Sequence, residues 1–168
     1  MKRVLLALIV IAFLSPCLYG QTIEKGDSEL QFQGYYLTTE GLSYATGTMI
    51  YGHYLTSNIE IGVGPSISHS DSDYGDSETT FSGLAFFRYV FPSQSKSIPY
   101  INMQWYQYDF SPEGEADFTD YSWVQGGVGV KIFLNEYVAY DLSGNYGMGL
   151  AEGSEGMILL AAGVSVFF

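Results

Sequence analysis

The chain has 168 residues, enough for one domain, and carries 18 Asp and Glu against 6 Lys and Arg, a formal net charge of −12 at pH 7. An acidic surface repels phosphate groups, so this balance excludes nucleic-acid binding. The single cysteine, Cys17, excludes an internal disulfide.

The first 20 residues are typical of a secretory signal peptide. Lys2 and Arg3 give a positive start, residues 4–14 are almost wholly apolar, and Gly20 is a small residue suited to the position before a cleavage site. The apolar run is too short to cross a bilayer as a helix, which argues against a retained anchor. Pro16 argues against lipidation of Cys17. We expect residues 1–20 to be removed, leaving residues 21–168 with four basic and eighteen acidic residues, a formal charge of −14.

From about residue 28 onward the dominant hydrophobic period is two, which predicts strands with unlike faces. Each stretch is about as long as a tilted strand that crosses a bilayer. The connections alternate between short turns and longer loops rich in acidic residues and glycine, the pattern of an antiparallel up-and-down transmembrane barrel. The sequence therefore predicts an all-β, eight-stranded barrel with strands near residues 28–38, 43–54, 59–69, 80–91, 99–109, 121–133, 137–148 and 156–168.

The placement of charge distinguishes a membrane barrel from a soluble, lipocalin-like barrel that binds an apolar ligand. In the stretch 59–67, Ile59, Ile61 and Val63 share one face, whereas Glu60 shares the other face with glycine and serine. Charges within the strands avoid the apolar face, as expected for a surface in contact with lipid. Aromatic residues gather near both ends of the strands, and many of them are candidates for interfacial girdles, although Trp123 is expected to point inward. The candidates are Tyr51, Tyr54, Tyr89, Phe91, Tyr100, Phe133 and Phe168 at the turn ends, and Tyr36, Tyr44, Phe81, Tyr106, Tyr108, Tyr121, Trp123 and Tyr146 at the loop ends.

Two features carry a resemblance to a known family. Tyr54-Leu55 and Phe133-Leu134 begin similar strand–turn–strand units, and the chain ends in Val164-Ser165-Val166-Phe167-Phe168. The chain resembles the small eight-stranded outer-membrane barrels, a porin-family group that includes outer membrane protein X and the barrel domain of outer membrane protein A. The resemblance implies a location in the bacterial outer membrane, contact with its lipid and lipopolysaccharide, and recognition of Val164, Val166 and Phe168 by the barrel-assembly machinery.

An eight-stranded barrel is just wide enough for side chains to fill its interior, so we expect no porin-like conduction. The inward charges must then be paired, because an isolated buried charge is costly. Neighbouring strands place Glu60 near Arg88 and Lys131 near Asp141, which predicts an interior polar network. A proton or ion relay is the alternative. Inward glycines at positions 62, 64, 127 and 129 would give room to the larger inward side chains.

The predicted loops carry many carboxylates and no Lys or Arg. A solvated acidic surface is the simplest interpretation, and contact with divalent cations or an unidentified basic extracellular partner is the functional one. The segment from Asp71 to Asp76 departs from the EF-hand order of ligands, so we predict no specific metal site. The candidate contact residues are Asp71, Asp73, Asp76, Glu78, Glu113, Glu115, Asp117 and Asp120.

Catalysis has little support in the sequence. The imidazole bases available are His53 and His69, and neighbours on a strand point to opposite faces, so His69-Ser70-Asp71 cannot form a triad by adjacency. We expect no catalytic residue and no cofactor. The preferred function is a non-enzymatic barrel with a filled lumen and acidic loops that contributes to envelope integrity or surface contact. The alternatives are a lipid-modifying outer-membrane enzyme and a soluble lipocalin-like binding barrel.

Overall fold

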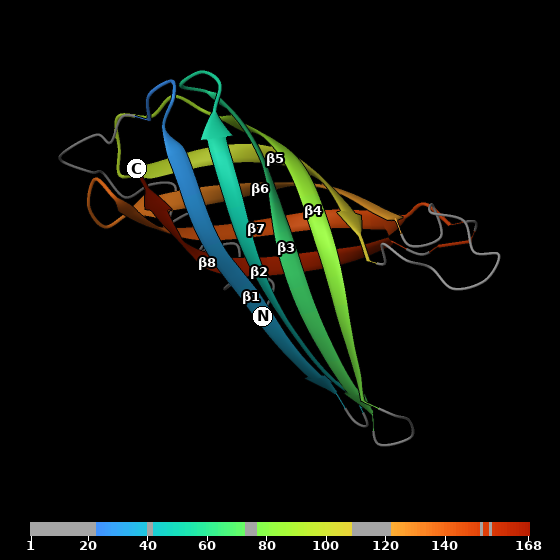
Figure 1. Cartoon of the computed structure of the whole chain (residues 1–168). Helices are drawn as coiled ribbons and strands as arrows, with labels where there is room; N and C mark the ends of the chain where they lie inside the picture. The colour runs from blue at the N-terminus through green and yellow to red at the C-terminus, as the bar shows by residue number, and fades with distance from the viewer. Residues whose placement is uncertain (1–22, 40–41, 73–76, 109–121, 152, 155) are drawn as a thin grey trace, which may run out of the picture.

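A computed structural model of the chain describes residues 23–39, 42–72, 77–108, 122–151, 153–154 and 156–168, with the backbone alone for 35–39, 42 and 72. Within these residues, eight antiparallel strands close into an up-and-down barrel, which confirms the predicted fold class (Figure 1). No helix among them is long and apolar enough to cross a membrane. The strands are β1 (Ser28–Thr39), β2 (Leu42–Tyr54), β3 (Ile59–Ser72), β4 (Glu78–Val90), β5 (Ser97–Gln107), β6 (Ser122–Phe133), β7 (Val138–Gly149) and β8 (Gly156–Phe167).

The two similar sequence units form the same kind of turn. In the β2–β3 turn, Leu55 N–H donates to the Ile59 carbonyl at 2.9 Å, and the Thr56 hydroxyl accepts from the Ile59 amide at 3.0 Å. In the β6–β7 turn, Leu134 N–H donates to the Val138 carbonyl at 2.8 Å, and the Asn135 side-chain oxygen accepts from the Val138 amide at 2.9 Å. A short polar side chain thus satisfies the backbone at the same position of both turns.

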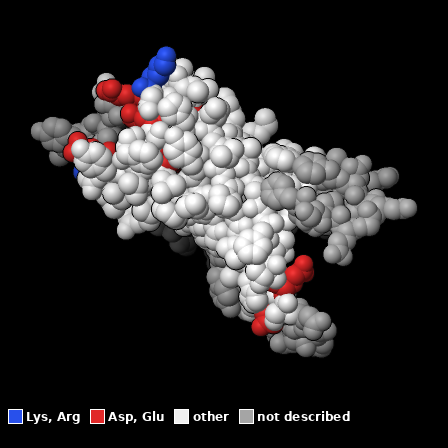
Figure 2. Space-filling view, viewed as in Figure 1, with Lys and Arg blue, Asp and Glu red and all other residues white. Residues whose placement is uncertain are grey.

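The barrel has the polarity of a protein surrounded by apolar solvent. Large apolar side chains are exposed on the outer wall, among them Val63 at 59% and Ile158 at 77%. All charged strand residues in the described part of the chain are buried inside, except Asp71 and Glu78 at the outer ends of β3 and β4. Figure 2 shows the charged side chains gathered at the two ends of the barrel, with an uncharged wall between them. Strand alternation therefore separates an apolar outside from a polar inside.

The turn end of the lumen is closed by an apolar cluster. Ile23, which precedes β1, packs there with Tyr54, Tyr100, Phe133 and other residues of the strand ends. Three of these residues were candidates for the outer girdle of aromatics, and that assignment is wrong, because they point inward and Tyr54 has no exposed surface. The apolar side chains of this cluster are Ile23, Tyr54, Val90, Ile98, Tyr100, Phe133, Ala139 and Phe167.

Closure of the barrel depends on a short ladder between its first and last strands. β1 pairs with β8 from Glu29↔Phe167 to Gly34↔Ala162 and not beyond, although both strands continue toward the loop end. The two strands lie side by side near the C-terminus and diverge toward the loops (Figure 1). The turn half of the barrel is therefore the fully paired half, and the loop half is more open.

The outer wall gives a direct test of what surrounds the barrel. Val63→Lys places a charge midway along β3 on the exposed apolar face, and in a bilayer this substitution should lower the free energy of unfolding by about 2–4 kcal/mol. Ser57→Lys, in an exposed turn, is the matched control and should have little effect. Urea titration of the barrel in lipid vesicles, followed by its shift in gel mobility, measures the difference. Equal stability of the two variants would contradict a lipid-facing wall.

Candidate functional site

Both predicted interior ion pairs are present, and each joins residues that face one another on neighbouring strands. Glu60 on β3 is in register with Arg88 on β4, and Arg88 Nη1 lies 2.7 Å from Glu60 Oε2. Lys131 on β6 is in register with Asp141 on β7, and Lys131 Nζ lies 3.1 Å from Asp141 Oδ2. These side chains are at most 2% exposed, so each pair is shielded from water.

A fifth residue, Glu29 on β1, joins the two pairs into one network. Its carboxylate lies 2.5 Å from Lys131 Nζ and 3.7 Å from Arg88 Nη1. It also accepts hydrogen bonds from the Ser165 hydroxyl at 2.6 Å and the Tyr54 hydroxyl at 3.2 Å. We call Glu29, Glu60, Arg88, Lys131 and Asp141 the ion-pair network.

Sequence reasoning did not single out Glu29, although a signal was present. Glu29, Gln31 and Gln33 alternate with Leu30 and Phe32, and the rule applied to the other strands places the polar set inside. The alternation does not predict which residue pairs with Glu29. Glu29 and Lys131 are 102 residues apart and lie on strands that are not neighbours, so their contact follows from closure of the barrel.

Aromatic rings pack around the ion-pair network. The Arg88 guanidinium lies 4.3 Å from the centre of the Tyr100 ring, and the Tyr100 hydroxyl donates to Asp141 Oδ1 at 2.6 Å. A Cβ atom at Gly129 would overlap the Tyr100 ring, so this glycine provides the space that the ring occupies. Phe86 uses the space at Gly62 in the same way. Gly62 and Gly129 therefore admit large side chains next to the network, as the sequence indicated.

The network lies in the turn half of the lumen and is unevenly charged. It holds three carboxylates and two basic groups, a formal balance of −1. Each basic group contacts two carboxylates. Loss of either basic group therefore removes a positive partner from two buried carboxylates. Glu60, by contrast, is paired with Arg88 alone among these ion pairs. The arrangement is suited to holding opposite walls of a closed barrel together.

The acidic loop residues are placed only in part. Asp71 and Glu78 are exposed near the ends of β3 and β4, and the Ser77 hydroxyl donates to Asp71 Oδ1 at 2.8 Å. Within the described residues, no group of three or more potential ligands could hold a metal ion. Six of the predicted contact residues lie outside the described residues: Asp73, Asp76, Glu113, Glu115, Asp117 and Asp120.

The histidines and the C-terminal residues lie on the barrel wall. His53 Nδ1 is 3.2 Å from the Ser28 hydroxyl, and His69 Nδ1 is 3.0 Å from the Thr79 hydroxyl. Val164, Val166 and Phe168 alternate along the outer face of β8 and its end, with exposures of 38%, 38% and 69%. The predicted assembly signal is therefore a row of apolar side chains on the outside of the barrel.

Solved structures share the fold, and two of them are from Pseudomonas aeruginosa. The N-terminal β-barrel domain of OprF from Pseudomonas aeruginosa aligns with a TM-score of 0.55 and 16% identity, over 86% of this chain and 98% of that one. The outer membrane protein OprG from the same organism aligns with a TM-score of 0.50 and 9% identity, over 89% of this chain and 98% of that one. No protein-family model matches the sequence, and neither does any curated protein. At 16% and 9% sequence identity, the structural similarity establishes the fold alone.

The uneven charge of the network predicts unequal effects of two isosteric substitutions. Lys131→Met leaves one basic group for three carboxylates, and loss of a buried partner should cost about 3–5 kcal/mol of unfolding free energy. Glu60→Gln leaves two acids and two bases, so its cost should be clearly smaller. Lys96→Met, at an exposed turn residue, is the control and should cost well under 1 kcal/mol, or about the effect of a surface charge. Equal urea midpoints for the three variants would contradict a coupled network.

Proposed function

We propose that this protein is a bacterial outer-membrane barrel that acts as a non-enzymatic, non-conducting component of the cell envelope. The observation that carries the proposal is the inverted polarity of the barrel: a fully buried ion-pair network inside and exposed apolar side chains outside. In water the exposed wall would be a large unfavourable apolar surface, and in lipid it is the favoured one. A soluble lipocalin-like barrel requires the opposite arrangement. The shared fold with OprF and OprG supports the same location.

The filled lumen favours a structural role over transport. Arg88, Lys131 and Tyr100 reach across the interior on the turn side, and the apolar cluster around Ile23 closes the turn end. Ions would have to displace both layers to pass. The outward-facing row of Val164, Val166 and Phe168 at the C-terminus is proposed as the contact for the barrel-assembly machinery.

At the loop end, we propose that the acidic residues contact the envelope through divalent cations. Anionic lipopolysaccharide and a surface rich in carboxylates repel each other directly, and cations shared between carboxylates and lipid phosphates would reverse that repulsion. Asp71 and Glu78 lie on opposite strands of one hairpin, near the end where such cations would act. A basic extracellular partner is the other route to the same electrostatic contact.

The closed lumen is tested by planar-bilayer recording of the purified, folded barrel. We expect no stable openings of porin-like conductance, because side chains fill the turn half. A general porin purified and reconstituted in the same detergent provides the positive control for insertion. Large, persistent openings at low voltage would overturn the non-conducting assignment.

Mass analysis of lipid A from cells with and without the protein separates this role from lipid modification. Altered lipid A in the presence of the protein would favour an enzyme.

The loop contact is tested by neutralising four acids together: Asp71→Asn, Asp73→Asn, Asp76→Asn and Glu78→Gln. The variant should fold and should bind lipopolysaccharide vesicles more weakly than the wild type in the presence of Mg²⁺ or Ca²⁺. The difference should shrink as salt rises, because the Debye length is about 8–10 Å at physiological ionic strength. Glu24→Gln with Glu136→Gln, at the turn end, is the control. Unchanged binding at low and moderate salt would remove the loop contact from the proposal.

A further inference from the structure

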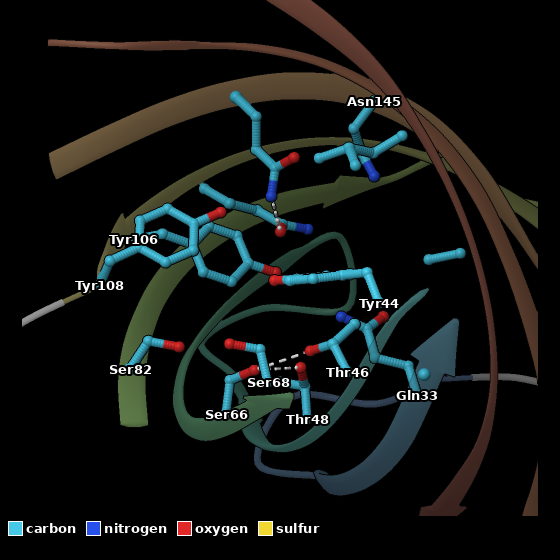
Figure 3. A pocket seen from close by; sticks show the side chains of 15 residues that line it. Gln33, Tyr44, Thr46, Thr48, Ser66, Ser68, Ser82, Tyr106, Tyr108 and Asn145 are labelled. Carbon is cyan, nitrogen blue, oxygen red and sulfur yellow. Dashed lines mark hydrogen bonds between the residues drawn. The ribbon is translucent and has the colours of Figure 1, made fainter. Parts of the chain in front are cut away.

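A small chamber lies in the lumen on the loop side of the ion-pair network (Figure 3). Its volume is about 40 Å³, and no charged side chain is among the residues that line it. One wall carries hydroxyl groups from β2, β3 and β4, and the facing wall carries side-chain amides from β5, β6 and β7. The hydroxyl wall consists of Thr46, Thr48, Ser66, Ser68 and Ser82, and the amide wall consists of Gln104, Gln125 and Asn145.

Each wall satisfies part of its hydrogen-bonding capacity internally. Thr48 Oγ1 and Ser66 Oγ lie 2.9 Å apart, and Gln125 Nε2 donates to Gln104 Oε1 at 2.9 Å. Two amide oxygens of the chamber, Gln125 Oε1 and Asn145 Oδ1, have no hydrogen-bond partner within the protein. These residues are only 3% and 5% exposed, respectively. A buried acceptor without a partner is costly, so these two oxygens require a donor from a molecule in the chamber, either water or a ligand.

Buried side-chain amides without a partner within the protein continue toward the ion-pair network. Asn102 on β5 is 7% exposed, and neither atom of its amide has a partner within the protein. Asn102 and Asn145 both pair with Gly127, one on each side, and a Cβ atom at Gly127 would overlap the Asn145 side chain. Gly127 therefore leaves space for the Asn145 side chain. We call the side-chain amides of Asn102, Gln125 and Asn145 the amide belt. The belt presents both donors and acceptors and carries no charge.

The lining restricts the ligand by charge, hydrogen bonding and size. A neutral lining disfavours an ionic ligand, because the ion would lose its hydration without a counter-charge. Hydroxyl groups both donate and accept, which matches a lining of amides and hydroxyls. A volume of 40 Å³ corresponds to roughly three water-sized positions. Tyr106 and Tyr108, stacked with ring centres 6.3 Å apart, add an apolar surface for carbon-bound hydrogens.

Among the described residues, the more exposed part of the chamber lining is on the loop side. Tyr44, Tyr106 and Tyr108 line the chamber and are partly exposed, whereas Phe86 and Arg88 on its turn side are buried. We propose that the chamber is a binding site for a short, neutral polyol with three hydroxyl groups, admitted from the loop side. The site is independent of the envelope role proposed above, since a structural barrel needs no luminal ligand.

The test uses glycerol as the probe and the barrel folded in lipid nanodiscs, observed through the side-chain amide resonances of Asn and Gln by NMR. Saturable shifts of Gln104, Gln125 and Asn145 are expected. Asn145→Leu, and separately Thr48→Val on the facing wall, should each weaken binding by about tenfold, the effect of one lost hydrogen bond. Ser57→Ala, in an exposed turn, is the matched control and should bind as the wild type does.

Two further probes test whether binding depends on the hydroxyl groups of the ligand or only on its size. 1-Propanol, with one hydroxyl group on the same number of carbons, should bind more weakly than glycerol, and acetate should not bind. The proposal is overturned if glycerol gives only linear shifts that are alike in wild type and Asn145→Leu, which would leave water as the occupant. It is also overturned if acetate or 1-propanol binds as tightly as glycerol. Gel mobility before and after boiling verifies that each variant is folded.

Discussion

The contact between Glu29 and Lys131 is the constraint on which the interior of this barrel depends. It joins β1 to β6, across the lumen, and the surrounding ion pairs extend it to β3, β4 and β7. Removing one partner of such a buried set is far more costly than omitting the whole set would be. The five charged residues therefore act together, and the aromatic rings around them are arranged by the same network.

Apolar surroundings explain why so much charge is found inside so small a barrel. The outer wall is exposed and apolar, so the usual position for Lys and Glu, on the outside of a strand, is unfavourable. Polar residues must then lie in the lumen, where they require partners. The inward glycines provide space for those partners, as at Gly129 beneath Tyr100.

The turn half and the loop half of the barrel differ in strand pairing and in the charge of the lumen. In the turn half, β1 and β8 are paired, and charged and aromatic groups fill the lumen. In the loop half, that ladder has ended and the lining is neutral, with amides and hydroxyls that leave a small chamber. The ladder that closes the barrel and the buried ion pairs are thus concentrated in the same half.

The sequence alone determined the eight strands, the inward placement of four charged residues, and their pairing as Glu60–Arg88 and Lys131–Asp141. It did so because period-two alternation defines faces, and consecutive antiparallel strands bring residues near a hairpin into register. The tertiary structure alone decided the role of Glu29, the packing of Ile23 into the turn end, and the inward orientation of Tyr54, Tyr100 and Phe133. It also decided the amide belt formed by Asn102, Gln125 and Asn145. These features depend on which side chains meet across the lumen. Those contacts are set by the pairing of β1 with β8, which closes the barrel. Hydrophobic periodicity along one strand does not predict this pairing.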